Sequence, residues 1–219
     1  MSNLPATHAS SSYDPIARAT KLIQLFCTPV DQFGILESAG PDEVPQPWRR
    51  LLNHQSHMTV AMERFYSAPV RLKVISQCTG TGTADRKPTP ADWYAREILL
   101  LDPLGKVVQY GVVRLDLRQL NASTLTAVLA AEIPLGRILI AAGELLEVQQ
   151  VQLLRVVPGP HLAGLLRGDT QRLATSTSTE WGPTFGRVAT ILLAGQPAIE
   201  LLEIVAPCAT RGGAVAEIS

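Results

Sequence analysis

The chain lacks an excess of charge of either sign, because nineteen lysines and arginines balance nineteen aspartates and glutamates over 219 residues. It therefore offers no broad basic surface, and we predict no nucleic-acid partner. It also lacks an apolar run near the roughly 20 residues that cross a membrane. The polar stretch from Met1 to Tyr13 has no apolar centre of the kind found in signal peptides. The sequence thus predicts no membrane partner.

Cysteine is scarce, and the spacing of the cysteines suits neither a set of disulfide bonds nor a metal site. Cys27, Cys78 and Cys208 are odd in number, lie far apart and form no CxxC motif, so they indicate reduced thiols in a cytoplasmic protein. His54 and His57 have helical ligand spacing, but no third ligand accompanies them as in HExxH. A metal site at these histidines is the weaker interpretation.

What is present suits one globular domain with a sizeable core, since 46% of the residues are hydrophobic. We predict a disordered tail at 1–13, a single domain at 14–207 and a C-terminal tail at 208–219. The monomer and the homodimer both remain open.

The hydrophobic periodicity changes along the chain from helical spacing to alternation. It predicts helices that begin at Asp14-Pro15 and after Pro134, and over 47–52, 59–66, 123–133 and 160–166. It predicts strands beginning at Val70 and over 93–102, 106–116, 145–157, 185–193 and 198–205, with a loop at 34–47. Helices come first, strands follow through short turns, and βαβ alternation is missing. We therefore expect an α+β fold with a single antiparallel sheet of five or six strands.

Two arginines stand inside apolar, strand-like runs. Arg96 lies in WYAREILLL and Arg114 lies in YGVVRL, on consecutive strands of one predicted hairpin. An arginine in such a run either pairs with an acid or marks a site that binds one. Pairing with Glu97 or Asp116 on a solvated face is the alternative, and the strand register decides whether the two arginines share a face.

One acid stands in a comparable position on the last strand. Glu203 shares its period-two face with Ile199, Leu201 and Val205, so its carboxylate points with apolar side chains. Burial raises the pKa of a carboxyl group and a nearby guanidinium lowers it, so such an acid can be tuned for proton transfer. The alternative is a structural salt bridge to a core arginine such as Arg187.

Taken in order, the short motifs of residues 46–207 resemble the chorismate lyase (chorismate–pyruvate lyase) family. The motifs are His57-Met58-Thr59 with Glu63, Tyr94-Ala95-Arg96-Glu97, Tyr110-Gly111 to Arg114, Pro134-Leu135-Gly136-Arg137, Phe185-Gly186-Arg187, and Glu203 with Pro207. The chain is closer to the branch of the family that carries HMT and GxxR. The resemblance implies a six-stranded antiparallel sheet with helices packed over it, a fold shared with effector-binding domains of some transcription regulators.

The resemblance also implies roles for particular residues. Arg96 matches the arginine that binds the substrate carboxylate, and Glu203 matches the acid near the C-terminal strand. Met58 and Leu135 match pocket residues. Val112 stands where the better-known bacterial branch has its second arginine, and we expect Arg114, two residues later, to reach the same ligand.

The implied activity is elimination of pyruvate from chorismate to give 4-hydroxybenzoate, a quinone precursor. Two arginines would bind the substrate carboxylates, Glu203 would act as general acid, and no cofactor or metal would be required. Two other interpretations stay open. One is a non-catalytic small-molecule (effector) binding domain of the same fold, although the roughly 45 residues before Gln46 are too few and too weakly basic for a winged helix. The other is a degenerate lyase kept as an interaction protein.

Overall fold

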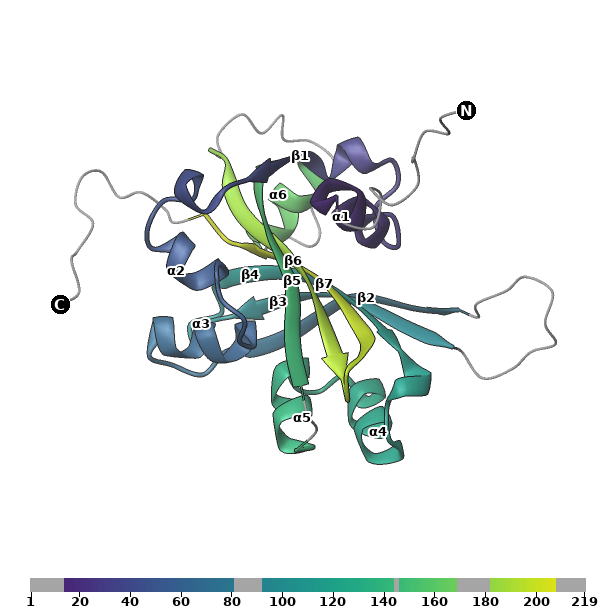
Figure 1. Cartoon of the computed structure of the whole chain (residues 1–219). Coiled ribbons are helices and arrows are strands. Elements are labelled where there is room, and N and C mark those ends of the chain that lie inside the picture. Colours follow the sequence, from purple (N-terminus) through teal and green to yellow (C-terminus); the bar gives the residue numbers. More distant parts are fainter. Residues whose placement is uncertain (1–13, 81–91, 144–145, 169–181, 208–219) are drawn as a thin grey trace, which may run out of the picture.

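A single antiparallel sheet forms the centre of the molecule (Figure 1). The computed structural model describes residues 14–80, 92–143, 146–168 and 182–207, so the two predicted tails and Cys208 lie outside the described residues. The seven strands have the order β1-β5-β6-β7-β4-β3-β2, and every neighbouring pair is antiparallel. The strands are β1 (Gly34–Ala39), β2 (Arg71–Gly80), β3 (Trp93–Leu101), β4 (Val107–Asp116), β5 (Leu146–Pro158), β6 (Thr184–Leu193) and β7 (Gln196–Val205).

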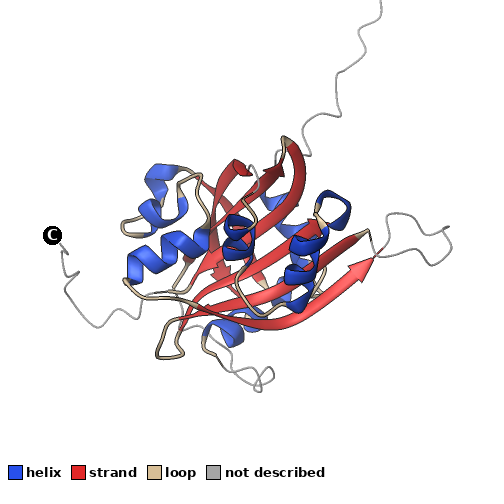
Figure 2. Ribbon diagram, turned by 90° about the horizontal axis from the view of Figure 1, so that it is seen from below, coloured by secondary structure: helices blue, strands red, loops and turns tan. Residues whose placement is uncertain are grey.

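Helices cover both faces of this sheet (Figure 2). The α-helices are α1 (Pro15–Ile23), α2 (Trp48–Leu52), α3 (Met58–Tyr66), α4 (Ala122–Ala130), α5 (Leu135–Ala141) and α6 (Pro160–Leu166). Short 3-10 turns lie at Val30–Gln32, Pro41–Glu43 and Leu117–Gln119. Helices α1 and α6 pack on one face, together with inward side chains such as Val188 and Leu202. Helices α2 to α5 pack on the other face.

The two-sided cover explains the composition of the central strands. Nine of the ten residues of β6 and six of the ten residues of β7 are buried, because alternate side chains enter different cores on the two faces. Val188 packs under α1 and α6, and its successor Ala189 packs under α4 and α5. A near-continuous apolar run is therefore expected in these strands, as in any sheet that is buried on both sides.

The α+β class, the single antiparallel sheet and the predicted helices and strands are confirmed, with one added strand. Residues 34–47 were predicted as a loop because they hold three prolines and two glycines. The prolines all follow Ala39, which leaves Gly34–Ala39 free to pair with β5 at the edge of the sheet. The close approach of the chain at Gly34 and Gly159 leaves no room for a Cβ atom at either position.

Within the described ranges, none of the helices has the length and apolar character needed to cross a membrane.

Candidate functional site

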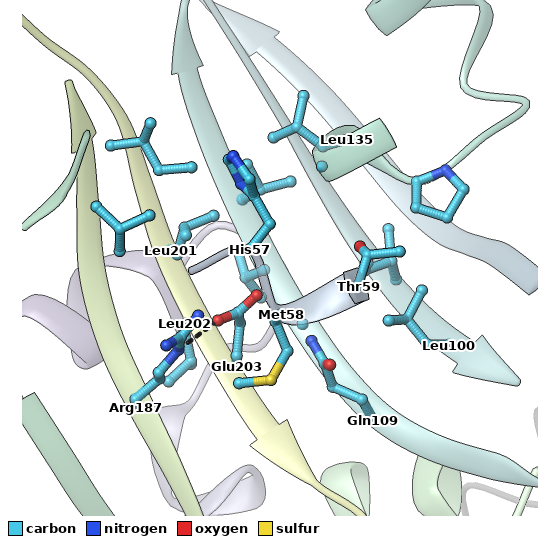
Figure 3. Close-up of a pocket in the computed structure, with 18 of the residues that line it drawn as sticks. His57, Met58, Thr59, Leu100, Gln109, Leu135, Arg187, Leu201, Leu202 and Glu203 are labelled. Atoms are coloured by element: carbon cyan, nitrogen blue, oxygen red, sulfur yellow. Dashed lines mark hydrogen bonds and ion pairs between the residues drawn. The ribbon is translucent and has the colours of Figure 1, made fainter. Parts of the chain in front are cut away.

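A cavity lies between the sheet and the beginnings of α3 and α5 (Figure 3). Its floor is formed by strands β3 to β7, and its roof by the segment Ser56–Thr59 and by Pro134–Gly136. The space open to the centres of water-sized molecules is about 50 Å³, against roughly 10–15 Å³ for a single water. Most of the lining is apolar, so the few polar side chains in it define what the cavity can bind.

The Arg96 guanidinium lines this cavity as a buried charge without a partner. Its side chain is 0% exposed, and no atom of the described residues meets hydrogen-bond geometry with any of its three nitrogens. The phenol oxygen of Tyr94 lies near the guanidinium and interacts with it favourably, but the contact does not meet hydrogen-bond geometry, and the Tyr94 hydroxyl donates to Gln77 at 3.0 Å. Burial lowers the pKa of Arg96, yet a guanidinium stays protonated in proteins. Burying a cation of this kind costs free energy unless an anion or a set of hydrogen-bond acceptors pairs with it.

A second arginine at the cavity, Arg187, is equally buried and fully paired. Its Nε donates to the Glu203 carboxylate at 2.7 Å, so the salt bridge that the sequence left open is present. The other nitrogens donate to the carbonyl oxygens of His54 at 2.8 Å, Ser56 at 3.2 Å and Leu52 at 3.3 Å. Arg187 therefore holds the roof segment onto the sheet, and Glu203 neutralises its charge (Figure 3).

Two histidines lie close to this pair, His54 just before the roof segment and His57 within it, and they carry no charge at neutral pH. Burial lowers the pKa of His54, and Arg187 lowers it further, against a smaller opposite effect of Glu203. Burial also lowers the pKa of His57, which Glu203 partly offsets. With Arg187 and Glu203 cancelling, the cavity has a formal charge of about one positive unit, which is Arg96.

The Pro-Leu-Gly-Arg motif fixes how the two roof helices meet. A Cβ atom on Gly136 would lie 3.2 Å from the Thr59 hydroxyl and 3.3 Å from the His57 Cβ, so the glycine permits a close approach of α5 to α3. Arg137 forms an ion pair with Glu63 across the same contact. These motif residues shape the cavity without supplying a free charge to it.

Arg114 does not join Arg96. In the register of β3 and β4, Arg96 faces Val113 and Arg114 faces Ala95, so the two arginines lie on opposite faces of the sheet. The Arg114 side chain is exposed, with its guanidinium 5.0 Å from the centre of the Trp93 ring. The expectation that both arginines reach one ligand is therefore wrong. The acids suggested as partners are also engaged elsewhere, since Asp116 pairs with Arg118 and Glu97 points to the opposite face.

The remaining predicted site residues come together at the cavity. Met58, Leu135, Glu203 and Val112 line it, although the side chain of Val112 packs in the core under α1. Sequence reasoning missed Gln109, a buried polar side chain at the same cavity. The available signal was a single amide inside the apolar run VVQYGVV. Among the described residues, no group of three metal-ligating side chains is found.

No family model matches the chain, and no curated protein matches it either. Solved structures with a similar fold include PhnF from Mycobacterium smegmatis, with a TM-score of 0.49, 13% identity and coverage of 70% of this chain and 64% of that chain. The effector domain of PhnF has a TM-score of 0.47 and 13% identity, and the match covers 69% of this chain and 88% of that one. The C-terminal domain of the histidine utilization repressor from Pseudomonas syringae has a TM-score of 0.41 and 13% identity, with coverage of 68% and 99%. The match thus spans less than two thirds of PhnF.

These findings correct the predicted activity. The similar structures include a GntR-family transcriptional regulator from Bacillus cereus, the effector domain of PhnF and a repressor domain, and none of these three is an enzyme. The prediction of a lyase, with its role in making a quinone precursor, is therefore wrong. The site agrees with the correction in two respects, because Arg114 faces away from the cavity and Glu203 is occupied by Arg187. Without a lyase reaction Glu203 has no general-acid role, and its carboxylate is the counter-ion of Arg187.

Proposed function

We propose that residues 14–207 form a non-catalytic binding domain whose cavity takes a small organic acid, with the carboxylate on Arg96. The observation that supports this proposal is the unpartnered guanidinium at the cavity wall. A carboxylate accepts two parallel hydrogen bonds from a guanidinium and cancels its charge. The ligand would thus supply what the described part of the protein does not.

The charge of the cavity limits the ligand to a monoanion with an apolar body. Arg96 is the positive charge left after Arg187 and Glu203 cancel, so a second carboxylate would approach a neutralised pair and the Glu203 oxygens. Around Arg96 the walls are aliphatic, with Ile98, Leu135 and Leu201 among them. Such walls favour a hydrocarbon body over a sugar or a peptide.

We expect binding to be the whole function of the site, because no acid among the described lining residues is free to transfer a proton to the ligand. The carboxylate of Glu203 accepts from Arg187. The nearby imidazoles of His54 and His57 have lowered pKa values and would be neutral at physiological pH. A ligand should therefore be recovered chemically unchanged.

The test is calorimetric titration of the wild-type protein with butyrate and benzoate, each compared with the uncharged amide of the same shape. We expect the acids to bind and the amides to show no detectable binding, because only the acids carry a negative charge that can pair with the Arg96 guanidinium. In Arg96→Met the acids should lose binding at least about 30-fold, the lower end of what removing one partner of a buried charge pair costs. Mass spectrometry of the recovered acid should show no product.

Arg114→Met is the matched control, since it removes the same charge from the same pair of strands on the other face of the sheet. It should leave the affinity for both acids unchanged within about twofold. Equal binding of acids and amides, or equal losses in the two arginine variants, would reject the proposal.

A further inference from the structure

Gln109 is the second side chain of the cavity with a buried polar atom that has no hydrogen-bond partner among the described residues. It lies in β4, is 2% exposed and points into the cavity beside Met58 and Leu100 (Figure 3). Its Oε1 atom is buried and accepts no hydrogen bond from the described residues. A buried amide left unpaired costs about as much as a lost hydrogen bond. Like Arg96, it is therefore a group that a ligand can complete.

The strand register places Gln109 at the far end of the cavity floor from Arg96. Arg96 faces Val113 of β4, and Gln109 precedes Val113 by four residues, so it projects from the same face. Four residues of an antiparallel strand span about 14 Å. The two unpaired groups thus stand at opposite ends of one floor.

Between these ends, β4 contributes no side chain to the floor. Gly111 lies midway along β4, with Ile98 and Glu203 as its cross-strand neighbours. A Cβ atom on Gly111 would already lie 3.3 Å from the Ile98 side chain and 3.5 Å from the Leu202 carbonyl oxygen. A longer side chain would have to rise into the cavity, so the glycine keeps its middle open.

We infer that the ligand is an extended acid with three parts. Its carboxylate lies on Arg96, its apolar body passes over Gly111, and a group at its other end forms a hydrogen bond with the Gln109 amide. This inference rests on the proposed carboxylate site at Arg96 and adds the group at the opposite end. Gln109 is then the residue that distinguishes acids by what they carry far from the carboxylate.

A terminal hydroxyl is the most informative probe of this end. A hydroxyl both donates and accepts, so it can complete either the oxygen or the nitrogen of the amide, whichever of them faces the cavity. A terminal methyl group can complete neither.

The experiment compares straight-chain acids of four to seven carbons with their ω-hydroxy analogues by calorimetric titration of the wild-type protein. At the chain length that reaches Gln109, we expect the hydroxy acid to bind about threefold to tenfold more tightly than the plain acid, the usual effect of one added hydrogen bond. At shorter lengths the hydroxyl should weaken binding, because it is buried without a partner.

Gln109→Met, which keeps the length of the side chain and removes its amide, should abolish the advantage of the hydroxy acid, so that it binds no more tightly than the plain acid of the same length. If plain acids bind through Arg96 but no hydroxy acid gains at any length, the role of Gln109 is rejected while the carboxylate site stands. If the advantage survives in Gln109→Met, the hydroxyl is bound elsewhere and the inference fails. If no acid binds at all, the proposed function fails first.

Discussion

Two buried arginines on opposite faces of the same sheet differ in their partners. One is hydrogen-bonded to other described residues of the protein, and the other is not. Arg18, on α1, gives one NH group to the Gln150 carbonyl and the Gln152 side chain, both at 2.8 Å. Its other NH group reaches Thr190 at 2.9 Å and Glu200 at 3.1 Å. Arg96, buried to the same degree or more, has no such partner among the described residues.

The contrast extends to neighbours in sequence. Glu97 follows Arg96 directly, enters the opposite core and is completed by the Tyr110 hydroxyl at 2.8 Å and His161 at 3.0 Å. On that face the buried charges are paired, as stability requires. On the cavity face Arg187 follows the same rule and Arg96 departs from it. This departure at a cavity wall is the observation that supports the proposed binding role of Arg96.

The largest effect should come from breaking the paired arginine of the cavity face. Arg187→Met would leave the Glu203 carboxylate without its cation and release the carbonyls of Leu52, His54 and Ser56. We expect a loss of about 3–5 kcal/mol in the free energy of unfolding, as for other broken buried pairs. Urea denaturation measures it, and a loss below about 1 kcal/mol would show that the roof needs no such anchor.

Breaking the paired arginine of the other face should cost less. Arg18→Met removes four hydrogen bonds, but Glu200 is 39% exposed at its side chain and can be solvated by water. We expect a loss of about 1–3 kcal/mol by the same urea assay. The affinity for acids should not change, because Arg18 lies across the sheet from the cavity. Altered acid binding in this variant would contradict the separation of the two faces.

The smallest effect should be a pH dependence from the cavity roof. Burial lowers the folded-state pKa of His54 and His57, so below pH about 6.5 the unfolded chain binds protons that the folded chain does not. The free energy of unfolding should therefore fall as the pH drops from 7.5 to 5.5. The double variant His54→Gln, His57→Gln should show a flatter profile over this range in urea titrations, and an unchanged slope would assign the effect to other groups.

Most of the fold could be predicted because its signals are local. The apolar runs of β6 and β7 and the Asp14-Pro15 start of α1, where Asp14 caps Ile16 at 3.0 Å, depend on residues close together in sequence. The edge strand Gly34–Ala39 was missed because it is short and exposed on one side, and it is ordered by pairing with β5, far away in the chain.

The face of each arginine was harder to predict, because it depends on register. Moving the β3–β4 pairing by one residue would place Arg114 opposite Arg96, and a shift of one residue exchanges the faces of a whole strand. The local sequence could also not show that Arg96 lacks a partner. Its nearest acid, Glu97, points to the opposite core, and the other suggested acid, Asp116, binds Arg118.

The central claim is that the Arg96 guanidinium binds the carboxylate of a ligand. It is tested most directly by the free energy of unfolding of Arg96→Met, measured with and without an acid. Without ligand, removing an unpaired buried cation should raise the free energy of unfolding by about 1–3 kcal/mol. With saturating butyrate, the wild type should gain stability by mass action and the variant should gain none. A variant that is less stable than wild type without ligand, or equally stabilised by butyrate, would contradict the account.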